Sequence, residues 1–214
     1  MGREDKLSNY EQMKERMSGA FLKCDQKDMI RRLSLDYDQT YLYICFLGRE
    51  YRINRLTGSV SWSKDSFITE ESANYNEVMT IYDVLTYSEK RRALAHEWIN
   101  IESLSPIQNG SMKKGSSLFW NFEQYFDGKT RSLANACEML GGRRIGKGDA
   151  AYELDMFAFL PIALRFWESD EEFPASLQIL ADKNILAYMH YETLMFAVTH
   201  MLNLLKGRIQ ADSR

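Results

Sequence analysis

Residues 141–174 read GGRRIGKGDAAYELDMFAFLPIALRFWESDEEFP and carry the clearest strand patterns of the chain. Apolar and polar side chains alternate over 150–157, which is typical of a strand with one buried face. Residues 159–167 are almost uniformly apolar, which indicates either a buried strand or one with an open edge at Pro161. This strand ends at Trp167, and four carboxylates follow within five residues: Glu168, Asp170, Glu171 and Glu172. An aromatic side chain and an acidic cluster at a strand end are the most distinctive feature of the sequence.

Helical and strand patterns occupy most of the remaining sequence. Apolar residues at three- and four-residue spacing predict helices over 9–22, 28–33, 74–87, 118–126, 131–140 and 191–205. Alternating, β-branched or aromatic runs predict strands over 40–47, 50–54, 60–63 and 98–104, with a hairpin turn at 56–59. Residues 105–115 contain proline, Asn-Gly and Lys-Lys-Gly and are predicted to be a flexible loop, whereas 175–186 have a mixed pattern.

These elements predict a single α+β domain. The expected sheet is mostly antiparallel and has helices packed on one face; its strands come from 40–63, 98–104 and 150–167, and its helices from 74–87, 118–140 and 191–205. A chain of 214 residues can bury a core large enough to fold without a metal or a disulfide. We expect the domain to cover 9–206, between a disordered N-terminal tail at 1–8 and a polar C-terminal tail at 207–214.

Composition disfavours several classes of protein. The formal charge is -3 at pH 7, and the basic residues form no run, which disfavours nucleic acid as a partner. The three cysteines, Cys24, Cys45 and Cys137, are far apart and odd in number, which argues against a disulfide framework. The first ten residues lack the apolar core of a signal peptide, and no apolar run approaches the ~20 residues that span a bilayer. We therefore expect a cytoplasmic protein that binds no membrane.

The turn at the start of the quoted stretch matches the first seven positions of a phosphate-binding loop, GxxxxGK. Its eighth position, which should be serine or threonine, is Gly148. The turn also follows a predicted helix and enters a predicted strand, whereas a phosphate-binding loop leaves a strand and opens a helix. We interpret it as a helix end followed by a basic turn, in which Arg143 and Arg144 remain candidates for contacting an anionic ligand.

No metal site is expected from the histidines. His96, His190 and His200 are isolated, and none belongs to a complete zinc motif. His200 falls opposite the apolar stripe of the last predicted helix and is expected to face solvent. The sequence also contains no GxSxG motif for a nucleophilic serine. No cofactor is indicated.

The acidic cluster allows three interpretations. It is a solvated turn anchored by Phe173 and Pro174, a surface that recognises a ligand or partner, or a site for a divalent cation. The leading hypothesis is a ligand- or partner-binding accessory domain for an unidentified small molecule or protein. The candidate binding residues are Asp149, Trp167, Glu168, Asp170, Glu171, Glu172, Arg143 and Arg144.

Two alternative functions remain open. One is an enzyme in which Asp149 shares acid–base or metal chemistry with one carboxylate of Asp170, Glu171 or Glu172. The other is a structural module that forms a homodimer, with Phe196 and Leu204 as candidate contacts on the last helix.

The quoted stretch resembles an uncharacterised bacterial and archaeal family called domain of unknown function 3786. The resemblance rests on Gly141-Gly142, Gly148-Asp149-Ala150, Leu160-Pro161, Trp167 to Pro174, Asp182, Tyr188 and Glu192, with Gly48, Tyr51, Thr57-Gly58 and Trp98 upstream. It covers roughly residues 13–205 and implies no assigned activity. Some members of the family carry this domain beside a cysteine-rich iron–sulfur segment, in organisms with corrinoid metabolism. The present chain has no such segment, and it differs from the family pattern at Ile162-Ala163 and His190.

Overall fold

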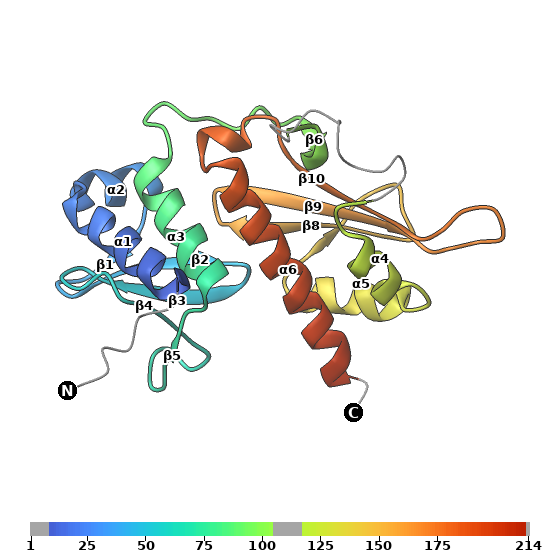
Figure 1. The fold of residues 1–214 in the computed structure, drawn as a ribbon, viewed down its shortest axis with the longest axis horizontal. Coiled ribbons are helices and arrows are strands. Elements are labelled where there is room, and N and C mark those ends of the chain that lie inside the picture. Colours follow the sequence, from blue (N-terminus) through green and yellow to red (C-terminus); the bar gives the residue numbers. More distant parts are fainter. Residues whose placement is uncertain (1–8, 105–116, 213–214) are drawn as a thin grey trace. The chain divides into compact units, whose positions relative to one another are not determined.

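A computed structural model of the protein describes residues 9–104 and 117–212 (Figure 1). The tail predicted at 1–8 and the loop predicted at 105–115 lie outside the described residues. Within the described ranges the chain forms six α-helices and ten strands, and the strand pairs are antiparallel. The predicted α+β class and mostly antiparallel sheet are therefore confirmed.

The chain divides into two compact units, which are described separately. Unit 1 comprises Met1–Arg91 with Ala187–Ala197, and unit 2 comprises Arg92–Leu186 with Val198–Arg214. Each unit combines helices with antiparallel strands. The prediction of one domain over 9–206 stays a prediction.

Unit 1 contains the antiparallel strands that were predicted over 40–47, 50–54 and 60–63. Its strands pair in chain order and are β1 (Asp36–Tyr37), β2 (Tyr41–Phe46), β3 (Arg49–Asn54), β4 (Val60–Ser63) and β5 (Glu71–Ser72). Its helices are α1 (Asn9–Lys23), α2 (Gln26–Leu33), α3 (Tyr75–Tyr87) and the first part of α6 (Tyr191–Asp212). Helix α3 begins with a capping box in which Asn74 and Glu77 satisfy each other's backbone N–H groups. It packs against both α1 and α2.

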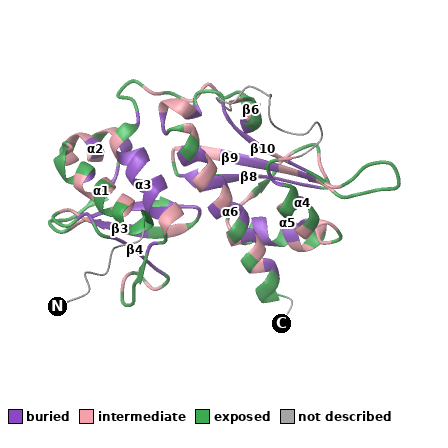
Figure 2. Cartoon of the chain, viewed as in Figure 1, coloured by how far each residue is buried: buried purple, intermediate pink, exposed green. Residues whose placement is uncertain are grey.

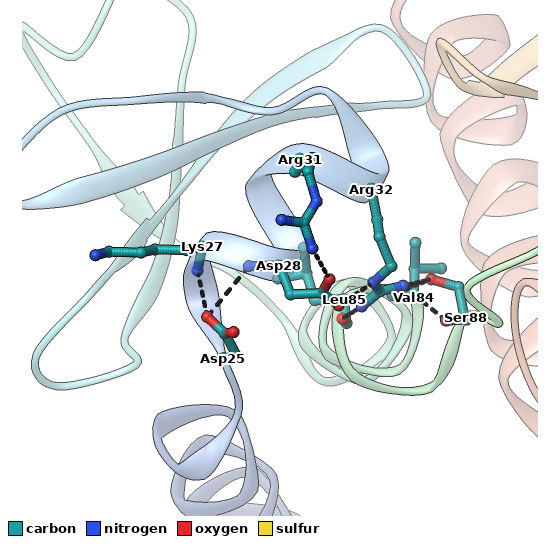
Figure 3. A network of polar contacts seen from close by, with 8 residues as sticks. All are labelled: Asp25, Lys27, Asp28, Arg31, Arg32, Val84, Leu85 and Ser88. Carbon is teal, nitrogen blue, oxygen red and sulfur yellow. Dashed lines mark hydrogen bonds and ion pairs between the residues drawn. The ribbon is translucent and has the colours of Figure 1, made fainter.

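One arginine joins α2 to the end of α3 (Figure 3). The last carbonyls of a helix have no partner within it. Arg32 donates from Nη1 to the carbonyl oxygen of Ser88 at 2.7 Å and from Nη2 to that of Leu85 at 3.2 Å. Its Nε also donates to Asp28 at 2.7 Å, and this bond is the main reason that the pKa of Asp28 is lowered. A single guanidinium thus satisfies the end of one helix while it is held by a carboxylate of another.

The hairpin turn between β3 and β4 depends on a glycine. Gly58 has φ +74°, and its carbonyl oxygen accepts a hydrogen bond from the buried hydroxyl of Tyr82. Ser18 on α1 donates to the neighbouring carbonyl of Thr57 at 2.9 Å. A side chain at position 58 would collide with Ser18 Oγ, so both the left-handed backbone and the close approach of α1 require glycine here.

Replacing Gly58 by alanine should destabilise the protein by about 1–2 kcal/mol or more, because the residue must keep a left-handed conformation and displace Ser18. The matched control is Gly19→Ala in α1, where no atom lies within 4 Å of the added methyl group. That change should be neutral or stabilise by about 0.5–1 kcal/mol. Urea unfolding followed by circular dichroism measures both, and equal midpoints for the two variants would contradict this account.

Unit 2 is built around antiparallel strands in the order β8-β9-β10-β6, and the short strand β7 also pairs with β8. Its elements are β6 (Trp98–Asn100), a 3₁₀ turn (Ile101–Leu104), α4 (Trp120–Phe126), α5 (Thr130–Met139), β7 (Arg143–Arg144), β8 (Ala150–Phe157), β9 (Leu160–Trp167), β10 (Ser176–Asp182) and the remainder of α6; a 3₁₀ turn (Ile185–Ala187) follows β10. The central strands β8, β9 and β10 are largely buried (Figure 2). Helix α5 packs on β8, and α4 packs on β10.

The structure resolves the ambiguity at Pro161 and corrects several predicted boundaries. Strand β9 is central and buried, and Pro161 lies next to a bulge in β8, beyond the pairing with β10, where its missing N–H is tolerated. The strand predicted over 98–104 ends at Asn100, whose side chain accepts from the N–H of Glu102 at 3.0 Å and starts a 3₁₀ turn. Strand β10 was not predicted, and α6 continues past Leu205 to Asp212.

The expectation that His200 faces solvent is wrong. Its exposed fraction is 5%, and Val198, Met201 and Leu202 beside it are also buried. The buried surface of this helix is therefore wider than the single apolar stripe that the sequence indicated.

Candidate ligand-binding pocket

The register of β8 and β9 brings together two acidic residues that are distant in sequence. Ala150, the first residue of β8, pairs with Phe166 near the end of β9. Asp149 therefore immediately precedes β8 and lies beside the end of β9. The N–H of Asp149 donates to the carbonyl oxygen of Phe166, and its Oδ2 accepts from the N–H of Glu168, both at 2.9 Å. Gly148, with φ +128°, permits this approach, because a Cβ there would lie 3.2 Å from the carbonyl oxygen of Phe166. Asp149 therefore anchors the first residue after β9.

The connection from β9 to β10 is closed by its own hydrogen bonds. Asp170 Oδ1 accepts from the N–H groups of Glu172 and Phe173 at 2.8 and 2.7 Å, and the N–H of Asp170 donates to the carbonyl of Phe173 at 3.0 Å. These bonds form an Asx-type turn. The phenyl ring of Phe173 is left 66% exposed. The acidic segment is thus an ordered turn that presents an aromatic ring.

Helix α4 supplies a second set of polar residues. Trp120, Glu123, Gln124 and Asp127 are spaced by three and four residues, so they lie on one face of the helix and just past its end. Asp127 accepts two hydrogen bonds from Ser169, one from the backbone N–H at 3.0 Å and one from the hydroxyl at 2.8 Å. The backbone bond is the main cause of the lowered pKa of Asp127.

Glu123 connects the same helix to the start of β10. Its Oε1 accepts from the N–H of Leu177 at 3.0 Å, and its side chain is largely buried. The two residues are 54 positions apart in the sequence, so this contact forms only in the folded unit. It fixes the end of the β9–β10 connection as Asp127 and Asp149 fix its beginning.

These segments surround a pocket of about 940 Å³. Its lining combines aromatic side chains, carboxylates and small polar groups, all from unit 2: Ser117, Trp120, Glu123, Gln124, Asp127, Asp149, Trp167, Glu168, Ser169, Asp170, Phe173, Pro174, Ala175, Ser176 and Gln178. Ser176 and Gln178 alternate along β10 with the buried Leu177, as expected for one face of a strand. The volume lies at the upper end of the range usual for small-molecule sites.

The structure brings together part of the site predicted from the sequence. Asp149, Trp167, Glu168 and Asp170 line the pocket. Glu171 and Glu172 are exposed on the same connection and are not among the described lining residues. They therefore belong to the surface next to the pocket.

The two predicted arginines lie on β7, away from the pocket lining. Arg143 forms ion pairs with Glu153 at 2.8 Å and Asp155 at 2.7 Å, the two polar residues of β8, and these pairs raise its pKa. Arg144 is exposed opposite Tyr152 in the pairing register. As predicted, this turn follows a helix and enters a strand.

The residues of α4 were not predicted as part of the site. From the sequence they were predicted only as part of a helix over 118–126. The spacing of Trp120, Glu123, Gln124 and Asp127 is the signal that could have identified them. No pattern in the sequence indicates that this face of α4 is directed at the connection after β9.

Two further features concern only residues 9–104 and 117–212. No group of three or more histidine, cysteine or acidic side chains in these ranges is arranged to hold a metal ion. No helix formed by these residues has both the length and the apolar character required to cross a membrane.

The fold and pocket define an α+β protein with antiparallel strand pairing and an acidic, aromatic pocket in its second unit. The chain belongs to the family described as Domain of unknown function (DUF3786), whose profile matches residues 25–203 of its 214 residues. The resemblance noted in the sequence is thereby confirmed. Comparison with curated proteins and with solved structures returns no match.

The Asp127–Ser169 contact should make the stability of the protein depend on pH. Because folding lowers the pKa of Asp127, its ionised form stabilises the native state above the ordinary pKa of about 4. That contribution is lost as the pH falls through the lowered value. The variant Asp127→Asn should therefore be less stable than the original protein near neutral pH, and the difference should shrink below about pH 4.

Thermal unfolding between pH 3 and pH 7 measures this difference. Glu171→Gln is the matched control, because it removes an exposed carboxylate of the same connection and should change the melting temperature little. A difference between Asp127→Asn and the original protein that stays constant over this range would show that the carboxylate charge has no role.

Proposed function

We propose that this protein is a binding module whose functional site is the pocket between α4 and the β8–β9–β10 strands of unit 2. The proposal rests on one observation: the pocket is lined by accessible aromatic rings, and side-chain hydrogen bonds fix the backbone of the adjoining β9–β10 connection. Trp120 is 54% exposed, and Trp167 and Phe173 also line the pocket. Accessible large aromatic side chains are typical of surfaces that recognise a ligand or a partner.

The hydrogen bonds that anchor the β9–β10 connection favour a binding site over the alternative interpretation of a solvated turn. Four carboxylates from three segments accept backbone N–H groups of residues 168–177: Glu123, Asp127, Asp149 and Asp170. A connection held in this way loses little conformational entropy when a ligand binds. The proposed site is therefore organised before the ligand arrives.

We place this function in the cytoplasm of a bacterial cell. The support is the three cysteines, which are distant in sequence and form no disulfide. The bacterial assignment rests on the family resemblance given above.

The two alternative functions have less support. For an enzyme, Asp127, Asp149 and Asp170 accept hydrogen bonds from the backbone, which is an anchoring role. For a dimerising module, Phe196 and Leu204 are half-buried, and the ring of Phe196 contacts Tyr75 at a centroid distance of 5.5 Å. Both alternatives remain hypotheses.

A thermal-shift screen tests the proposal. The panel should contain short-chain ammonium, guanidinium, carboxylate, phosphate and neutral heteroaromatic compounds. A compound that binds only the native state at 100 times its dissociation constant should stabilise that state by about 2.7 kcal/mol. For a chain of this size, the melting temperature should then rise by about 5–10 °C.

The control variants locate the binding site. Trp120→Ala removes an exposed ring of the pocket and should abolish the shift. Trp98→Ala removes an exposed tryptophan of β6 that is not a lining residue and should leave the shift unchanged. The proposal fails if no compound of any class shifts the melting temperature, or if every shift survives in Trp120→Ala.

A further inference from the structure

Glu123 is a buried carboxylate that lacks a positive partner. Its exposed fraction is 7%, and it lines the pocket from α4. Oε1 accepts from the N–H of Leu177, whereas Oε2 has no hydrogen-bond partner among the described residues. No described lysine, arginine or histidine forms an ion pair with it. Oε2 is not fully enclosed and therefore opens onto the pocket. A carboxylate with so little contact with water favours a ligand that brings a cation to it.

The rest of the lining has the same sign of charge. Four other carboxylates border the pocket, and none of its described lining residues is lysine or arginine: the four are Asp127, Asp149, Glu168 and Asp170. A concave site lined by one sign of charge attracts ligands of the opposite sign. An anionic ligand would meet repulsion without any compensating group from the lining.

The aromatic residues specify the kind of cation. Trp120, Trp167 and Phe173 present rings to the same pocket, and an organic cation is attracted to the face of such a ring. A bare metal ion is disfavoured because no three acidic, histidine or cysteine side chains of the described residues are arranged to hold one. Oxygens of Asp127, Asp149 and Asp170 also already accept backbone hydrogen bonds. The combination fits an alkylammonium or alkylguanidinium group.

We propose that the pocket binds an organic cation, an ammonium or guanidinium group on a short aliphatic chain, with its charge against Oε2 of Glu123. This inference rests on the proposed binding function and adds the chemical class of the ligand. The cation belongs either to a free amine or to a lysine or arginine side chain of a partner protein, because both present the same group.

Calorimetric titration with matched compounds tests the charge. n-Butylammonium and n-butylguanidinium are the cationic compounds, n-butylurea is the neutral counterpart of the guanidinium, and pentanoate is the anion. N-acetyl-lysine N-methylamide and N-acetyl-arginine N-methylamide represent partner side chains. The cations should bind about tenfold or more tightly than butylurea, and pentanoate should not bind. Tighter binding of the amino-acid amides than of the simple cations would indicate a partner side chain, and the reverse order would indicate a free amine.

Glu123→Gln removes the charge and keeps an oxygen that can accept from the N–H of Leu177. This variant should weaken cation binding by about tenfold or more and leave butylurea binding unchanged. Glu172→Gln is the matched control, since it removes an exposed carboxylate of the β9–β10 connection that does not line the pocket, and it should change cation binding by less than about threefold.

The outcomes separate the two proposals. If butylurea or pentanoate binds the original protein as well as the cations do, the pocket binds a ligand but the cation inference is wrong. Equal cation affinity in Glu123→Gln would overturn the role of that carboxylate. Should Glu123→Gln fail to fold, the comparison of butylguanidinium with butylurea on the original protein still decides the matter. If no compound in the thermal-shift panel binds, both proposals fail.

Discussion

The antiparallel register of β8, β9 and β10 is the constraint on which the pocket depends. One end of this sheet holds the start of β8, the end of β9 and the start of β10, because Ala150 pairs with Phe166 and Trp167 pairs with Ser176. A shift of the register by one residue would turn every side chain of a strand to the opposite face. The alternating burial along β10 therefore fixes where Ser176 and Gln178 point as well as where the core lies.

The carboxylates of this region divide into two roles. Those of Asp127, Asp149 and Asp170 accept backbone N–H groups and hold the connection after β9 in one conformation. Glu123 anchors Leu177 with one oxygen and leaves the other oxygen without a described partner. An acidic cluster in a sequence therefore says little about function until each oxygen has been assigned a partner. In this pocket the incompletely paired carboxylate of Glu123 is the feature that distinguishes a binding site from a solvated acidic turn.

Much of the fold could be predicted because strong periodicities are local properties of a sequence. In the six helices apolar residues recur every three to four positions, and in the strands β2, β3, β4, β8 and β9 they tend to recur every two. Strand β10 was missed because its alternation is interrupted: Leu180 and Ala181 are both buried, as is common in a strand that is covered on both faces. Local patterns do not distinguish such a segment from an irregular one.

The site could be predicted only in part, for the same reason. Asp149, Trp167, Glu168 and Asp170 flank the two strands of one hairpin, so a correct prediction of β8 and β9 was enough to bring them together. The residues of α4 reach the pocket through tertiary contacts such as the one from Glu123 to Leu177. Neither the spacing of residues along α4 nor the composition of the chain contains that information.

The lining of the pocket also has a consequence for how the family can diversify. Every described lining residue falls between positions 117 and 178, so the pocket is encoded by one continuous stretch of the gene. Substitutions on the exposed face of α4 and along the connection after β9 could alter what is recognised while the central strands keep their packing. Homologous proteins could thus differ in ligand through a few substitutions within residues 117–178. A recombinant gene in which this segment is exchanged between two members of the family would transfer ligand recognition with it.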